Sequence, residues 1–253
     1  MLILEILAFT MFERQKSISL YLHAKGIAAT VLSLVSLDNV FVLRLEKIIP
    51  AALIAIVFHE TSHGLMSYLL GDPTPKEQGR LTLNPSKHLD LFGTLCLVFL
   101  GFGWAKPVRV DPRYYKNHKW GMAFVALAGP LANFIIAMLG GLMYAILLKF
   151  SSFTGISEML AEFSMYLVMI NVGLGIFNLI PIPPLDGSKI IGAFLPESAY
   201  YQYMKYQKYG MIFVLGLLVL LDFLQAMGYP SLFDKVLTDA FYFVIQFWLK
   251  IFF

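Results

Sequence analysis

The sequence contains few charged residues and almost no cysteine. Only 14% of its 253 residues are charged and 58% are hydrophobic, whereas a soluble domain has about 45–50% apolar residues. The single cysteine, Cys96, excludes an internal disulfide, and its apolar surroundings favour a buried, inert thiol over a catalytic Cys-His pair. No basic run is interleaved with aromatic residues, so nucleic acid is not an expected partner. The mean hydropathy of +0.73 agrees with these absences and predicts a polytopic membrane protein.

Long apolar runs are present instead. A membrane-spanning helix needs about 20 mostly apolar residues. Four runs meet this requirement, namely 48–70, 121–148, 163–182 and 209–228. The tail, 236–253, is long enough for a fifth, although Asp239 and Lys250 weaken it. The expected fold is an all-α integral membrane protein, a polytopic bundle of about 5–6 transmembrane helices in a single domain over residues 1–253.

The N-terminal region leaves two possibilities open. Residues 1–12 and 26–43 are both apolar, and either could span while the other lies at the interface as an amphipathic segment. A cleaved secretory signal is not expected, because the charges of Arg14 and Lys16 follow the first apolar run instead of preceding it.

The apolar segment 91–103 is only 13 residues long, which suits a re-entrant, membrane-associated hairpin better than a span. The loops beside it, 71–90 and 104–120, carry eight Lys and Arg residues in total, so the positive-inside rule places both loops in the cytoplasm. Gly101 and Gly103 would allow the chain to reverse within the segment. Alternation then makes the first long helix end inside, with its C-terminal half toward the cytoplasmic side of the cell membrane.

The run 48–70 contains the motif H-E-x-x-H, formed by His59, Glu60 and His63. Residues four apart share one face of a helix, so both imidazoles can reach one zinc ion while the glutamate lies beside a bound water. The alternative is a polar helix end that faces water. However, eleven largely apolar residues precede His59, and burying three polar side chains there without a metal would cost on the order of several kcal/mol.

Catalytic zinc usually takes three protein ligands, so the two histidines need a partner. An extended motif of the soluble enzymes would place a histidine at position 69, which is Leu69, so the third ligand must come from elsewhere. Asp186 is the best candidate, because three prolines before it break the 163–182 helix, and such breaks at membrane depth face protein or a wet cavity. The alternative is that Asp186 caps a helix starting near Ser188. Beside the two histidines, ligation is the favoured interpretation.

Two asparagines are candidates for contact with a substrate. Asn133 lies inside the 121–148 run, and Asn178 precedes the proline-rich break. Either amide could donate to a developing oxyanion or hold a substrate backbone. Each could equally form a hydrogen bond between helices that fastens the bundle. His88 lies in a polar loop, where a ligand role is possible but a solvated or structural histidine is the favoured interpretation.

Several segments in one order resemble the site-2 protease family of intramembrane zinc metalloproteases, in the short form without PDZ or CBS domains. These segments are His59-Glu-Thr-Ser-His63, Gly71-Asp-Pro-Thr-Pro75, Gly79-Arg-Leu-Thr-Leu-Asn-Pro-Ser-Lys-His88, Gly103-Trp-Ala-Lys-Pro-Val108, Ala128-Gly-Pro-Leu-Ala-Asn133 and Asn178-Leu-Ile-Pro-Ile-Pro-Pro-Leu-Asp-Gly187. The resemblance covers about residues 48–195, which leaves 1–45 as an N-terminal extension without a family motif.

The resemblance implies one zinc ion held by His59, His63 and Asp186, with Glu60 as the base that acts on zinc-activated water. It implies a core of three helices, two asparagines near the substrate, and a substrate that is a transmembrane protein or peptide in the lipid bilayer. A metal or proton transporter is the first alternative, but it would need more ionisable residues on successive helices. An inactive scaffold is the second, but it would lack a ligand or the base, and all four residues are present.

Overall fold

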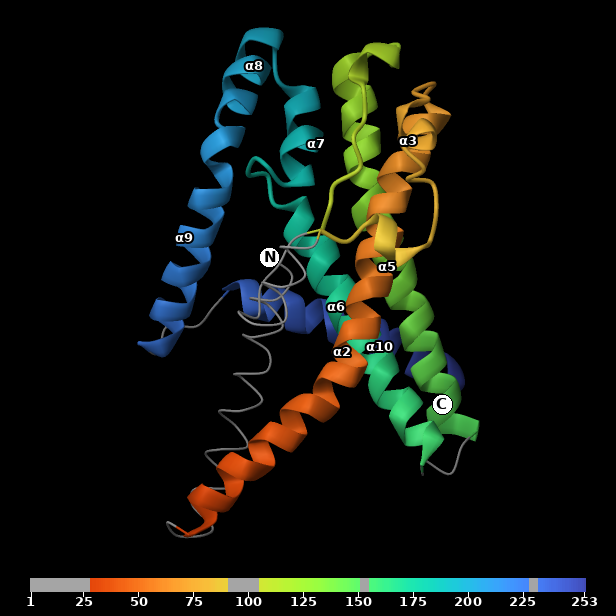
Figure 1. Ribbon diagram of the computed structural model, residues 1–253, viewed down its shortest axis with the longest axis vertical. Coiled ribbons are helices and arrows are strands. Elements are labelled where there is room, and N and C mark those ends of the chain that lie inside the picture. Colours follow the sequence, from red (N-terminus) through yellow and green to blue (C-terminus); the bar gives the residue numbers. More distant parts are fainter. Residues whose placement is uncertain (1–27, 91–104, 151–154, 228–231) are drawn as a thin grey trace.

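The computed structural model describes residues 28–90, 105–150, 155–227 and 232–253 (Figure 1). In these ranges the chain is helical, apart from one isolated β-bridge and connecting loops. The elements are α2 (Ala28–Leu69), α3 (Thr74–Glu77), η1 (Pro85–Lys87), η2 (Pro112–Tyr114), α5 (His118–Phe150), α6 (Ile156–Leu179), α7 (Asp186–Phe194), α8 (Glu197–Lys205), α9 (Gln207–Ala226) and α10 (Leu232–Phe252). The all-helical fold class predicted from the sequence is confirmed for the described residues.

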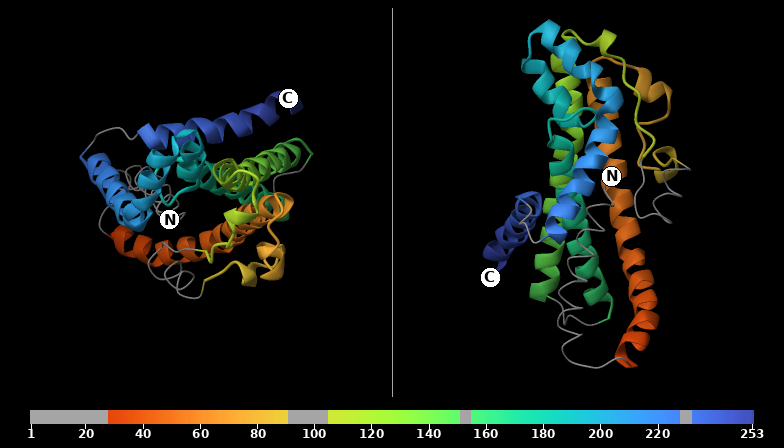
Figure 2. Two further views of the ribbon diagram at one scale, coloured as in Figure 1. Left: turned by 90° about the horizontal axis from the view of Figure 1, so that it is seen from above. Right: turned by 90° about the vertical axis from the view of Figure 1, so that its left-hand side faces the viewer.

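Three helices of the described chain are long and apolar enough to cross a membrane. They are Ile48–Leu69 within α2, His118–Phe150 and Ile156–Leu179, which correspond to three of the predicted spans. The protein is therefore a polytopic membrane protein. The predicted runs 209–228 and 236–253 form α9 and α10, whose crossing of the membrane stays a prediction. Figures 1 and 2 show that α10 runs across the bundle, at a steep angle to α5 and α6.

The bundle of α2, α5 and α6 is held together by small residues that let the helices approach closely. Ala51, Ala52 and Ala55 of α2 are buried in one cluster with apolar side chains of α5 and α6. Gly140 of α5 faces Val168 of α6, where an added Cβ would lie 3.1 Å from the valine side chain. Such close packing of small residues is the usual means of associating helices in a membrane.

Helix α2 differs from what the sequence predicts for the N-terminal region. The apolar runs 26–43 and 48–70 were expected as separate segments, but residues 28–69 form one helix of 42 residues that includes Pro50. The charged residues between the runs do not end it, and Pro50, which removes one helical hydrogen bond and favours a kink, does not end it either. Figure 1 shows the N-terminal half of α2 bending away from α5 and α6.

The segment that follows α2 is fastened to the end of that helix by the buried carboxylate of Asp72. One of its oxygens accepts hydrogen bonds from the Ser67 hydroxyl at 2.7 Å and the Asp111 backbone N–H at 2.8 Å, and the other accepts from the Thr74 backbone N–H at 2.9 Å. Burial alone would raise the pKa of Asp72, but these hydrogen bonds together hold it below its usual value. Asp72 thus fixes the chain around Asp111 alongside α2.

The predicted hairpin 91–103, with Cys96, lies outside the described residues, but the chain on either side of it is described. Leu89 and Ala105 pair as an antiparallel bridge, and the Lys106 backbone N–H donates to the His88 carbonyl at 2.8 Å. The two ends of this stretch are therefore side by side.

The proline-rich break turns the chain back on the end of α6. Helix α6 ends at Leu179, and a Cβ added to Gly187 would lie 2.1 Å from the Leu179 carbonyl oxygen, so only glycine permits this approach. Likewise, a Cβ at Gly210 of α9 would overlap the Pro183 carbonyl. The two glycines let the break pack tightly between α6 and α9, and Asp186 is thereby brought toward α2.

Candidate metal centre

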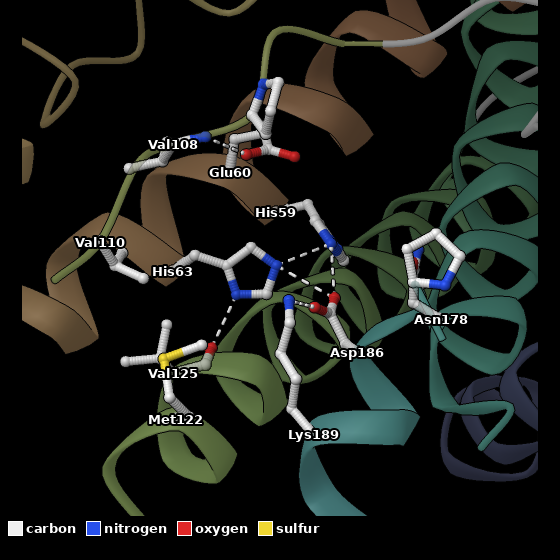
Figure 3. A pocket seen from close by; sticks show the side chains of 12 residues that line it. His59, Glu60, His63, Val108, Val110, Met122, Val125, Asn178, Asp186 and Lys189 are labelled. Atoms are coloured by element: carbon white, nitrogen blue, oxygen red, sulfur yellow. Dashed lines mark hydrogen bonds and ion pairs between the residues drawn. The ribbon is translucent and has the colours of Figure 1, made fainter. Parts of the chain in front are cut away.

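Three predicted ligand side chains meet at one point between α2 and α7 (Figure 3). His59 and His63 lie one turn apart on α2, and their Nε2 atoms are 2.9 Å from each other. Asp186 Oδ2 lies 3.2 Å from Nε2 of His59 and 3.1 Å from Nε2 of His63. All three residues are buried and can offer one ligand atom each to a metal ion. Among the residues that the structure describes, these three form the one group of His, Cys, Asp or Glu side chains whose ligand atoms lie close enough together to hold a metal ion.

Asp186 does not act as a helix cap, which was the alternative to ligation. It is the first residue of α7, whereas the N-cap position is occupied by Leu185 and no side chain caps that end. The carboxylate is turned toward α2 instead. The geometry thus favours the ligand interpretation of Asp186.

The orientation of His63 follows from its hydrogen bond to a backbone carbonyl. His63 Nδ1 lies 2.6 Å from the Val125 carbonyl oxygen of α5. Because a carbonyl can only accept, Nδ1 carries the proton, and a neutral His63 presents the lone pair of Nε2. A histidine that ligates a metal usually donates its other N–H in this way.

The orientation of His59 follows from a chain of buried hydrogen bonds. Asn133 donates through Nδ2 to the Ala55 carbonyl at 3.1 Å and to Asn171 Oδ1 at 2.9 Å. Asn171 in turn donates to the Leu167 carbonyl at 2.8 Å. Asn133 Oδ1 therefore faces His59 Nδ1, 2.6 Å away, and accepts a hydrogen bond from the Nδ1–H of His59. A neutral His59 also presents the lone pair of Nε2.

The donor set therefore fits a zinc ion. With neutral imidazoles, two nitrogen lone pairs and a carboxylate oxygen converge within hydrogen-bond distance, and no proton lies between them. The three electron-rich atoms repel one another, and a divalent cation bound between them would remove that repulsion. Two histidines and one carboxylate are a known ligand set of catalytic zinc.

Gly129 of α5 is the position against which both imidazoles pack. A Cβ at this residue would lie 2.5 Å from Nε2 of His63 and 2.7 Å from Cε1 of His59. These distances are too short for real atoms, so any side chain there would displace a ligand.

We expect Gly129→Ala to weaken zinc binding by about 10- to 100-fold, the range seen when the support of a metal ligand is disturbed. Zinc retention by the purified protein against a competing chelator would measure the effect. Gly216→Ala on α9 is the matched control, because no atom from another described part of the chain lies within 4 Å of a Cβ added there. Equal zinc retention by both variants would contradict the packing that we describe.

The metal-binding group opens into a pocket of about 200 Å³. Its lining is His59, Glu60, His63, Pro107, Val108, Val110, Met122, Val125, Asn178, Pro184, Asp186 and Lys189. Glu60 is half-buried, and its Oε2 accepts a hydrogen bond from the Val108 backbone N–H at 3.0 Å. The predicted base therefore lies beside the predicted ligands, and the segment around Val108 holds it there.

The structure separates the two asparagines. Asn178 lines the pocket and donates to the Leu174 carbonyl at 3.0 Å. Asn133 is fully buried behind His59 and is not part of the pocket lining. The substrate contact of Asn133 stays a prediction. The hydrogen bonds of Asn133 to α2 and α6 favour the alternative from the sequence, in which this side chain links helices.

Two partners of the metal-binding group were missed in the sequence. The Val125 carbonyl orients His63, and no residue type could have signalled a backbone group. Lys189 Nζ lies 3.0 Å from Asp186 Oδ1, and the position of Lys189 one helical turn after Asp186 could have indicated this contact.

His88 is fully buried, so the solvated alternative for this residue is wrong. Its Nε2 lies 2.8 Å from the Thr82 carbonyl oxygen.

Comparisons with known proteins agree with this centre. The chain is 38% identical over 174 residues to "Putative zinc metalloprotease YwhC" of Bacillus subtilis. The aligned region covers 66% of this chain and 77% of that protein. It is 27% identical to "Putative zinc metalloprotease Rip2" of Mycobacterium tuberculosis strain H37Rv, covering 67% of this chain and 65% of that protein. It is 29% identical to "Putative zinc metalloprotease Rip2" of Mycolicibacterium smegmatis, over 76% of this chain and 73% of that protein.

The family model described as "Peptidase family M50" matches residues 154–221, the part of the chain that includes Asp186. No solved structure matches the chain. Because a metal-binding group is buried among helices that can span a membrane, and because the chain shares 38% identity with YwhC over most of that protein, it belongs to peptidase family M50, the zinc metalloproteases of the site-2 protease type.

Proposed function

We propose that this protein hydrolyses peptide bonds in or near transmembrane segments of other membrane proteins. The observation that supports it most is the convergence of His59, His63 and Asp186 on one point beside Glu60, in helices long and apolar enough to cross a membrane. We assign the three convergent side chains as the zinc ligands and Glu60 as the catalytic base.

Zinc, when bound, would supply a Lewis acid that polarises the scissile carbonyl and acidifies water. Glu60 takes a proton from the attacking water and passes it to the leaving amine. The Val108 N–H directs one oxygen of Glu60, which leaves the other for proton transfer. Val125 and Asn133 keep both histidines in the tautomer that presents Nε2.

The substrate must be unwound before it can be cleaved, because each carbonyl of a helix is engaged by the N–H four residues later. The pocket of about 200 Å³ is too small for a helix, which is about 10–12 Å across, so only an extended stretch of the substrate can enter it. Asn178 lines that pocket and is the asparagine to which we assign contact with the substrate backbone. An extended substrate could pair as a strand with the hairpin predicted for residues 91–103.

A test of this function compares the membrane proteome of cells that produce the wild type with that of cells that produce Glu60→Gln. The wild type should generate at least one membrane protein truncated within or beside a transmembrane segment, and the variant should leave it intact. A metal transporter would instead change cellular zinc content without truncating any protein, and that pattern would contradict our proposal.

We also propose that the loops 71–90 and 104–120 lie together on the cytoplasmic side. The bridge between Leu89 and Ala105 supports this, because the ends of the intervening stretch are adjacent. The eight Lys and Arg residues across the loops favour the cytoplasm.

In a Cys96→Ser background, single cysteines at Ser86 and Lys116 should therefore react with a membrane-impermeant thiol reagent only from the cytoplasm. Both positions are exposed. A cysteine at Ile156, which is 74% exposed at the start of α6, should react only from outside, because α5 separates it from the loops. Reaction of Ser86→Cys and Lys116→Cys from opposite sides would make 91–103 a true span.

A further inference from the structure

The two oxygens of the Asp186 carboxylate have different partners (Figure 3). Oδ2 faces the two histidines, 3.2 Å and 3.1 Å from their Nε2 atoms. Oδ1 accepts a hydrogen bond from Lys189 Nζ at 3.0 Å. The carboxylate is thus shared between the metal-binding group and an ammonium group that also lines the pocket.

Lys189 reaches Asp186 because both lie on one face of α7. They are three residues apart, and helical side chains lean toward the N-terminus, so the lysine extends back over the first turn. An exposed pair at this spacing would contribute only about 0.2–0.5 kcal/mol. Here the side chains of Asp186 and Lys189 are 8% and 24% exposed, so this is not an ordinary solvated pair.

We infer that Lys189 is a positioning residue that makes Asp186 a zinc ligand through one oxygen only. This inference rests on the proposed function, since it requires a zinc ion at the three ligands. A carboxylate that is free to rotate can engage a metal through both oxygens and so occupy one more coordination position. Catalytic zinc has three protein ligands and keeps one position open. By holding Oδ1, the ammonium group prevents Asp186 from closing that position.

A purely structural pair would have different consequences. If Lys189 served only to stabilise the first turn of α7, its removal would lower stability and leave the zinc environment unchanged. If it positions Asp186, its removal changes the number of atoms around the zinc while zinc stays bound. The two roles are therefore separated by a spectroscopic measurement on zinc, which requires no knowledge of the substrate.

The test uses the full-length protein, purified in detergent and loaded with zinc alone, and X-ray absorption at the zinc edge. Lys189→Met keeps an unbranched side chain of nearly the same length without its charge, and Lys189→Arg keeps a positively charged donor. Lys205→Met, at an exposed position of α8, is the matched control. We expect one zinc per chain in all proteins. Lys189→Met alone should gain one oxygen neighbour and the short zinc–carbon distance of a carboxylate bound through both oxygens.

An unchanged zinc environment in Lys189→Met, or the loss of zinc from a folded Lys189→Met protein, would overturn the inference. The same gain in Lys189→Arg would also overturn it, because arginine can hold Oδ1. If the methionine variant does not accumulate, Lys189→Leu poses the same question with a shorter side chain. A wild type that binds no zinc would refute the proposed function itself, and this outcome is distinct from one in which only the Lys189 variants behave unexpectedly.

Discussion

Replacing Glu60 with glutamine is expected to lower cleavage by at least about 10²-fold while zinc remains bound. Glutamine has the same shape but cannot take a proton from water. Its amide oxygen can still accept a hydrogen bond from the Val108 N–H, so the segment around Val108 should stay in place. None of the three proposed ligand atoms belongs to Glu60, which is why zinc should be retained.

The measurement needs two readouts on the same preparation, zinc content and the rate of truncation of a membrane protein that the wild type cleaves. Glu77→Gln is a suitable control, because Glu77 is exposed on α3 and does not line the pocket. Zinc loss from folded Glu60→Gln protein would show that Glu60 is a ligand, and undiminished cleavage would remove it from the chemistry.

Replacing Asp186 with alanine should abolish stable zinc binding and cleavage together. Two histidines would remain, and the Lys189 ammonium, without its partner at 3.0 Å, would face the metal position directly. Disturbing the support of a ligand costs about 10- to 100-fold in metal affinity, so loss of a ligand together with this repulsion should exceed about 10²-fold. His59→Ala and His63→Ala should also lower zinc occupancy, because each removes one ligand while leaving the pair of Asp186 and Lys189 in place.

Zinc occupancy after dialysis against a chelator would measure these losses. Asp239→Ala provides the control, since Asp239 is an exposed aspartate of α10 that does not line the pocket. Full zinc occupancy and full activity in Asp186→Ala would mean that the third ligand lies elsewhere in the chain.

The sequence predicted the metal-binding group well because its members sit in local patterns. His59 and His63 are four residues apart in one helix, and helical periodicity alone puts them on one face. Asp186 could be predicted because the prolines before it mark a break in an apolar helix. Its alternative role as a cap could not be dismissed, because capping depends on where α7 begins, and sequence places helix ends poorly.

Other features depend on contacts between distant segments and could not be predicted. The hydrogen bond of Asn133 to His59 joins residues 74 positions apart, and nothing in the run 121–148 indicates which way the amide points. The continuity of α2 was missed because the charged residues between positions 43 and 48 interrupt the apolar pattern, although they do not stop helical hydrogen bonding.

The chain of hydrogen bonds behind His59 has a consequence for how a substrate enters. It runs from His59 on α2 through Asn133 on α5 to Asn171 on α6. Moving any two of these helices apart would break the chain, leave buried amides unpaired and remove the partner that orients His59. The three helices should therefore keep their relative positions while a substrate enters.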